Sequence, residues 1–176
     1  MISSPAGNDL LFDESQLEQG RNFNNKMWNA LKLIKTWESR TADNVSDTEV
    51  RFAIDWMENR LAQVAQEVAE LMKDFRLSEG LKTIYSLIWN DFCSWYLEWV
   101  KPGFEQPISQ HVYERTIAIY EQLIQLLHPY MPFITEEIYH QLRNRQGGND
   151  LIVKELPAYD SIDANVLKQG AMLQEL

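Results

Sequence analysis

Cysteine is almost missing from this sequence, in which Cys93 is the only one among 176 residues. A single thiol excludes an internal disulfide and a cysteine-rich zinc site. No apolar run is long enough to cross a bilayer, and the N-terminus lacks the basic start and apolar stretch of a signal peptide. Glycine and proline are few as well, at seven and six residues, so no flexible linker is expected. We therefore expect a cytoplasmic protein with no membrane partner.

Positive charge is also scarce. The chain carries 16 lysines and arginines against 26 acidic residues, for a net charge of −10. This is the wrong sign for a protein held to nucleic acid by bulk electrostatics, so DNA is not an expected partner. A polyanionic partner would have to meet a local basic patch, or other parts of a longer chain would have to help.

Recognisable catalytic motifs are absent as well. The sequence has no glycine-rich phosphate loop, no H-E-x-x-H and no nucleophile elbow. Glu136 and Glu137 form a carboxylate pair, but adjacent helical positions point about 100° apart, and we interpret the pair as favouring the positive end of a helix dipole. Cys93 has no histidine nearby in sequence, which favours a buried, inert thiol. The residues predict no catalytic, cofactor or metal site in this chain.

What the sequence does contain is helical periodicity. Apolar residues recur at alternating three- and four-residue spacing from Val50 to Phe75, which predicts a helix over residues 47–75. Ser46 and Glu49, three positions apart, indicate a capping box at its start. Similar stripes predict four further helices, over residues 14–38, 81–99, 112–127 and 132–145. The predicted fold class is all-α, an up-down helical bundle.

The two ends of the chain differ from this middle. Residues 1–13 are polar and broken by glycine and proline, as if they trailed from a preceding domain, whereas residues 14–147 would form the bundle. Residues 148–176 would form an extended C-terminal strap, in which "DLIVKELP" is a short strand or an extended segment, followed from Asp163 by an unfinished helix. We therefore expect the chain to be part of a longer protein.

A surface site is suggested by aromatic residues that lie off the apolar stripe. Phe52 and Trp56 are neighbours at i, i+4 and lie well around the helix from Ile54 and Met57. They could stack unpaired bases, each worth about 1–3 kcal/mol, or another helix could cover them. Basic residues near them in sequence could meet phosphates: Lys32, Lys35, Arg40 and Arg60. By contrast, most rings of the aromatic segment 88–102 are expected in the core.

Four segments carry a family resemblance. "SSPAGNDLLFDE", "GRNFNNKMWNALKLI", "IWNDFCSWYLEWVKP" and "LLHPYMPFITEEIYHQL" resemble class I aminoacyl-tRNA synthetases, most narrowly the valine-specific members. The resemblance implies a helical anticodon-binding domain, with residues 1–13 as the tail of the catalytic region and residues 148–176 leading toward a C-terminal coiled coil. A parent of this kind attaches valine to tRNA(Val) using ATP and Mg²⁺. Its ATP-binding motifs and editing domain are missing from this sequence, so the chain alone is expected to be inactive.

The resemblance also assigns site residues. It implies that Trp56, in "AIDWMENRL", lies against an anticodon base, although Asp55 stands where relatives often have a basic residue. Lys32 falls where relatives often carry arginine. The implied partners are the anticodon stem-loop of tRNA(Val) and the catalytic and coiled-coil domains of the same chain. Two alternatives stay open: the same domain of an isoleucine, leucine or methionine enzyme, and a helical protein-interaction module.

Overall fold

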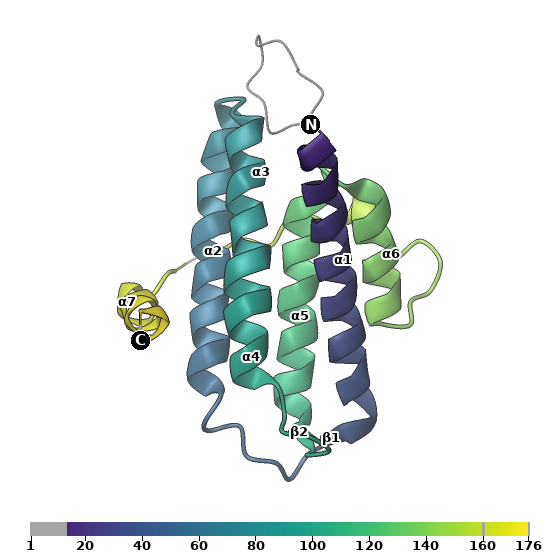
Figure 1. The fold of residues 1–176 in the computed structure, drawn as a ribbon, viewed down its shortest axis with the longest axis vertical. Coiled ribbons are helices and arrows are strands. Elements are labelled where there is room, and N and C mark those ends of the chain that lie inside the picture. Colours follow the sequence, from purple (N-terminus) through teal and green to yellow (C-terminus); the bar gives the residue numbers. More distant parts are fainter. Residues whose placement is uncertain (1–13, 160, 176) are drawn as a thin grey trace.

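A computed structural model describes residues 14–159 and 161–175. The chain forms a bundle of helices (Figure 1), and the predicted all-α fold is confirmed. The helices are α1 (Glu14–Trp37), α2 (Arg51–Lys73), α3 (Leu77–Ser86), α4 (Leu97–Val100), α5 (Gln110–Leu127), α6 (Pro132–Leu142) and α7 (Ala164–Gln174). The predicted tail, residues 1–13, lies outside the described residues. Within the described part, no helix is both long and apolar enough to cross a membrane.

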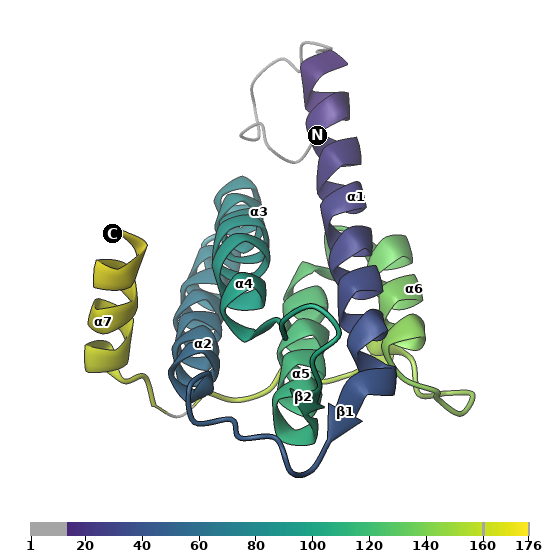
Figure 2. The same cartoon turned by 60° about the horizontal axis from the view of Figure 1, so that its bottom comes forward.

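The helices stand in a fixed order across the bundle. Figure 2 shows α7 outermost, followed by α2, the α3–α4 helix, α5 and α1, with α6 on the far side. The α2 helix packs against α3, α5 and α7, whereas α1 packs against α5 and α6. As a result, α1 and α2 lie on opposite sides of the core.

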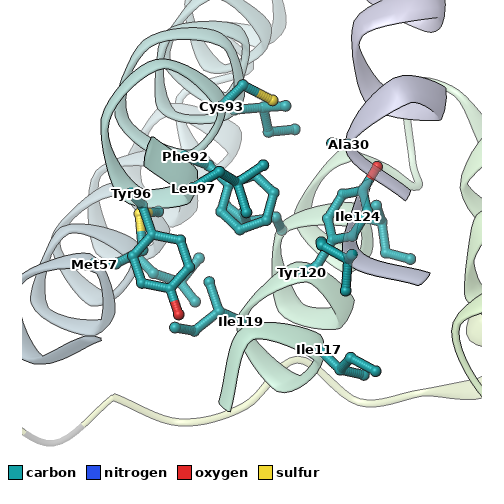
Figure 3. Packing of buried hydrophobic residues seen from close by; sticks show 14 of the residues in the cluster. Ala30, Met57, Phe92, Cys93, Tyr96, Leu97, Ile117, Ile119, Tyr120 and Ile124 are labelled. Carbon is teal, nitrogen blue, oxygen red and sulfur yellow. The ribbon is translucent and has the colours of Figure 1, made fainter. Parts of the chain in front are cut away.

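Aromatic rings fill the centre of the bundle (Figure 3). Phe92 stacks on Tyr96 and on Tyr120, with ring centroids 5.6 and 5.0 Å apart. The buried hydroxyls have partners: Tyr120 donates to the Met27 carbonyl at 2.7 Å, and Tyr96 lies 2.8 Å from Thr116 Oγ1. Burial of each such side chain stabilises the folded protein by about 1.5–3 kcal/mol. The prediction that rings of the 88–102 segment belong to the core is confirmed for Phe92 and Tyr96.

The third helix differs from the regular α-helix that the sequence predicted. It begins at Leu77 rather than Leu81, and residues Leu87–Tyr96 between α3 and α4 form a π-helix. Ser94 Oγ donates to the carbonyl of Trp89, five residues earlier, at 2.9 Å. An apolar stripe does not distinguish this wider turn from an α-helical one, because the same face stays buried in both.

The predicted capping box of the second helix is wrong. The helix begins at Arg51, and no side chain caps it. Instead, the carbonyl of Asp47 accepts the backbone N–H groups of Val50 and Arg51, both at 3.0 Å. The Asp47 carboxylate binds Arg51 Nε at 3.0 Å and His111 Nδ1 at 2.9 Å, which holds residues 47–50 as a turn.

One end of the bundle is closed by two loops, and we call it the distal end. It comprises the 3₁₀ turn Glu38–Arg40, residues 41–50 and residues 101–109. Strands β1 (Thr41–Ala42) and β2 (Ile108–Ser109) pair in parallel there, with Thr41 opposite Ile108 and Ala42 opposite Ser109.

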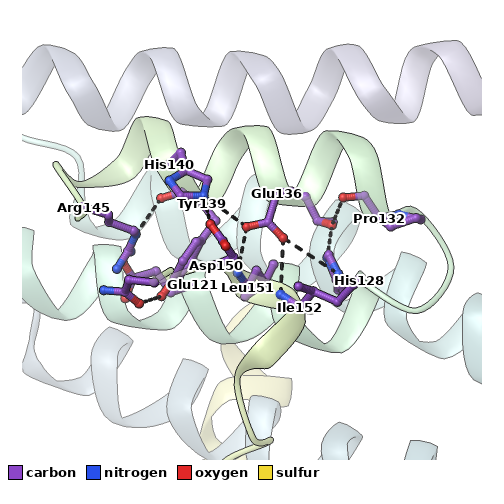
Figure 4. Close-up of polar contacts among 12 residues, drawn as sticks. Glu121, His128, Pro132, Glu136, Tyr139, His140, Arg145, Asp150, Leu151 and Ile152 are labelled. Carbon is purple, nitrogen blue, oxygen red and sulfur yellow. Dashed lines mark hydrogen bonds and ion pairs between the residues drawn. The ribbon is translucent and has the colours of Figure 1, made fainter. Parts of the chain in front are cut away.

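The strap after α6 is a 3₁₀ turn, Leu151–Val153, followed by extended chain. Glu136 of α6 holds it: the carboxylate accepts the N–H of Leu151 at 2.7 Å and that of Ile152 at 3.2 Å (Figure 4). His140 Nε2 lies 3.2 Å from Glu136 Oε1 and 3.0 Å from Asp150 Oδ1. Further on, Asp163 caps α7 by accepting the N–H groups of residues 165 and 166.

Candidate nucleic-acid interface

Positive charge gathers on one helix of this acidic protein. Between residues 21 and 40, which cover most of α1 and its 3₁₀ extension, Glu38 is the only acid. Five basic residues lie in the same stretch: Arg21, Lys26, Lys32, Lys35 and Arg40. The α1 helix therefore supplies the local basic patch that a polyanionic partner would need.

Lys32 and Lys35 are available on this helix. Lys32 is exposed and forms no ion pair with any residue that the structure describes. Lys35 Nζ lies 2.7 Å from Glu38 Oε2, in a pair whose side chains are 34% and 57% exposed. An ion pair at the surface contributes only about 0–1 kcal/mol, so a phosphate could replace Glu38 as the partner of Lys35.

Arg40 lies where α1 reaches the distal end. Its Nε donates to the Thr36 carbonyl at 3.4 Å, and its Nη1 donates to the Gln106 carbonyl at 3.5 Å. Two residues before Gln106 is Phe104, which is 89% exposed. This ring was missed by the sequence reasoning, although a lone aromatic residue in the loop "KPGFEQP" is the signal that could have found it. Arg40 and Phe104 give the distal end a cation and an exposed ring.

Lys26 is a second residue that sequence reasoning missed. Its Nζ lies 5.2 Å from the centroid of the Trp89 ring, which is a cation–π distance. Its charge also acts on Cys93, where burial raises the pKa of the thiol to about 12 and the charge of Lys26 partly opposes that rise. The predicted burial of Cys93 is confirmed.

Trp56 is covered rather than exposed. The side chain is 1% exposed and meets Trp99 edge to face, with centroids 4.9 Å apart. The α7 helix lies on the indole, because a Cβ added to Gly170 would come within 2.1 Å of Trp56 Nε1 and Cδ1. Phe52 is half-buried against the core. Of the two possibilities left open for this aromatic pair, coverage by another helix is the arrangement seen, and base stacking by Trp56 stays a prediction that requires α7 to move.

Arg60 is engaged inside the protein. Its Nε and Nη2 both donate to Asp91 Oδ2, at 3.0 and 2.8 Å, and its Nη1 donates to Gln63. Asp91 belongs to the π-helix and is 8% exposed. A carboxylate at that depth requires a partner, since desolvation opposes its charge. A role for Arg60 with RNA stays a prediction, and the structure gives it a partner in the π-helix.

The predicted site residues thus form two groups. Lys32, Lys35 and Arg40 lie on α1 and its extension, whereas Phe52, Trp56 and Arg60 lie on α2, across the core. At the distal end, residues 41–50 join Arg40 to the start of α2. This end and the outer side of α1 are the candidate interface.

One cluster has the composition of a metal site. Ligand atoms of Glu136, His140 and Asp150 lie within 4.8 Å of one another, which is close enough for one cation. Each of these groups already has partners, since Glu136 accepts two backbone N–H groups and His140 lies between the two carboxylates. The cluster's evident role is to hold the strap against α6.

The helical fold agrees with comparisons to known proteins. The chain belongs to the family described as "Anticodon-binding domain of tRNA ligase", which it matches over residues 55–176. It is similar to valine–tRNA ligases over its whole length: 45% identical over 176 residues to that of Phocaeicola vulgatus and 46% identical over 177 residues to that of Porphyromonas gingivalis. The similarity to the valine–tRNA ligase of Carboxydothermus hydrogenoformans is 33% over 175 residues, or 97% of this chain. The chain spans 20% of the length of each of these relatives.

Proposed function

We propose that this chain recognises the anticodon stem-loop of tRNA(Val) as the anticodon-binding domain of a valine–tRNA ligase. The observation that carries the proposal is the family match over residues 55–176. The similarity to valine–tRNA ligases favours the valine enzyme over those for isoleucine, leucine or methionine. The same match favours tRNA recognition over a helical protein-interaction module.

Recognition would combine a few phosphate contacts with base stacking. The basic residues of α1, above all Lys32 and Lys35, would contact phosphates of the RNA backbone, and Arg40 would do so at the distal end. With a net charge of −10, the chain as a whole repels a polyanion, so phosphate contacts are expected at the basic residues of α1. Unpaired bases would stack on aromatic side chains, as single-stranded RNA does in other proteins. Trp56 is the proposed partner from the family resemblance, and Phe104 is the ring already exposed.

The remaining steps would belong to the parent enzyme. We propose that the parent charges tRNA(Val) with valine using ATP and Mg²⁺ in the cytoplasm, and that its catalytic and coiled-coil domains contact this chain. The His-x-Gly-His and Lys-Met-Ser-Lys-Ser motifs of this enzyme class do not occur in the sequence. The chemical step would therefore lie outside these 176 residues.

The test uses the full-length enzyme with Lys32→Ala and Lys35→Ala combined. We expect the KM for tRNA to rise on the order of tenfold, because two phosphate contacts are lost. Valine activation without tRNA, measured by pyrophosphate exchange, should not change. Lys82→Ala is the matched control, since Lys82 is an exposed lysine on α3. Equal effects of the pair and the control, or equal losses in both assays, would contradict a tRNA-binding role for α1.

A further inference from the structure

We infer that α7 and an unpaired nucleobase compete for contact with the Trp56 indole. The α7 helix must therefore leave α2 before a base can stack on that ring. This inference rests on the proposed function. It takes the base contact of Trp56 from that function, and it makes α7 the element that opens or closes access to the ring. Figures 1 and 2 both show α7 outside the bundle, beside α2.

The contact between α7 and Trp56 depends on one glycine. Gly170 is the only buried residue of α7, and its missing side chain lets the helix backbone lie directly on the indole. A Cβ at this position would approach Trp56 Nε1 to 2.1 Å, so α7 or the indole would have to shift. The indole that Gly170 covers is also a ring on which a nucleobase can stack.

The rest of α7 is held weakly. Val166 and Leu167 are half-buried, whereas Met172 and Leu173 are 55% and 45% exposed. Few apolar contacts therefore have to be broken for α7 to leave α2, and a helix without tertiary packing exchanges its amide hydrogens faster.

The segment that leads to α7 is held by polar contacts. Asn59 Oδ1 accepts the Asp163 N–H at 2.6 Å, and Gln66 Nε2 donates to the Tyr159 carbonyl at 3.3 Å. Beside them is an open hollow of about 480 Å³ that is lined in part by Glu58, Asn59 and Arg115. Water can replace hydrogen bonds of this kind, so these contacts add little to the hold on α7.

The decisive variant is Gly170→Ala in the 176-residue chain. Its matched control is Gly20→Ala, because Gly20 also lies within a helix but an added Cβ there meets nothing within 4 Å. Both changes raise helix propensity equally, so only the clash with Trp56 differs. We expect faster amide hydrogen exchange in residues 164–174 for Gly170→Ala and no such change for Gly20→Ala.

Binding of an anticodon stem-loop RNA of tRNA(Val) is then measured with the same proteins. Gly170→Ala should bind at least about fivefold more tightly than the wild type, because the binding-competent form no longer has to displace α7. Adding Trp56→Ala to Gly170→Ala should remove that gain. In the wild-type chain, the RNA should accelerate exchange in residues 164–174. This measurement requires no variant to fold.

The outcomes separate this inference from the proposed function. The inference is wrong if Gly170→Ala leaves amide hydrogen exchange in α7 unchanged, or if it accelerates that exchange without tighter RNA binding. It is also wrong if RNA slows amide hydrogen exchange in α7 of the wild-type chain. Lys32→Ala and Lys35→Ala would still weaken binding in those cases, and the proposed function would stand. If the RNA binds neither the wild type nor Gly170→Ala, and the lysine variants of the full-length enzyme keep a normal KM for tRNA, both proposals fail.

Discussion

At the scale of single residues, the ion pair between Arg60 and Asp91 connects α2 to the π-helix. Replacing Arg60 with alanine leaves the carboxylate of Asp91, which is 8% exposed, without its partner. Breaking a buried pair costs about 3–5 kcal/mol, and we expect about 2 kcal/mol here because the Arg60 side chain is 29% exposed. The free energy of unfolding in urea measures this loss.

The control for that experiment is Arg51→Ala. Arg51 also pairs with an aspartate, Asp47, but its side chain is 67% exposed, so the change should cost less than about 1 kcal/mol. Similar losses for the two arginines would show that Arg60 does not compensate a buried charge. A double variant separates stability from function. If Asp91→Asn restores stability in the Arg60→Ala background, any remaining defect in tRNA binding is caused by the loss of the Arg60 side chain.

Cys93 provides a prediction about pH. Burial raises the pKa of its thiol from 9.0 to about 12, so the folded state keeps its proton where the unfolded state loses it. The resulting stabilisation is complete below pH 9 and is lost as the pH rises toward 12. We expect the unfolding free energy to fall over this range, and to fall less in Cys93→Ala. The thiol should also react slowly with a disulfide reagent at pH 8, and rapidly in urea; fast reaction of the folded protein would contradict its burial.

At the scale of elements, Glu136 decides whether the strap stays on α6. Glu136→Gln replaces a charged acceptor of two backbone N–H groups with a neutral one. Hydrogen bonds to charged groups contribute about 1.5–3 kcal/mol, so amide exchange at residues 151–153 should accelerate at least tenfold.

The neighbouring residue is the natural comparison for this variant. Among the residues that the structure describes, Glu137 accepts only from the side chain of Gln141, and Glu137→Gln should leave exchange in the strap unchanged. Equal exchange rates in the two variants would mean that apolar contacts of Leu151, which is buried, hold the strap without Glu136. The helix-dipole interpretation of this carboxylate pair did not include the strap, because its contact with Glu136 is formed across a loop.

For the whole molecule, we expect weak tRNA binding that depends on salt. The chain has a basic side on α1 and a net charge of −10, so affinity should fall steeply between 50 and 200 mM salt. Each phosphate contact contributes roughly 0.7–0.9 to the slope of log K against log salt concentration, and Lys32→Ala should lower that slope by about 1. Filter binding or fluorescence titration at several salt concentrations measures the slope. Tight binding without salt dependence would contradict phosphate recognition by α1.

Periodicity predicted the bundle well because each helix buries one continuous face. The helix predicted for residues 14–38 is found at Glu14–Trp37. Periodicity could not predict the π-helix, whose buried face looks the same in sequence, or the start of α2, which is determined by the turn at Asp47.

The candidate site was harder to predict than the fold. Lys32 and Lys35 were singled out by their charge and by their position before the loop at Arg40, and their contact with tRNA stays a prediction. The burial of Trp56 depends on Gly170, which is far from it in sequence and has no side chain to form a pattern. Phe104 is exposed in a loop at the distal end, and local residue types do not determine whether a loop side chain is buried or exposed.

The pairing of β1 with β2 has a consequence for the order of folding. The two strands hold only two residues each, yet they join parts of the chain between which α2, α3 and α4 all lie. Closing so long a loop for so few hydrogen bonds is entropically unfavourable until the helices have already brought the strands together. We therefore expect the distal end to be the last part of the bundle to form and the first to open. Arg40 and Phe104 would then reach their final positions only after the core is complete.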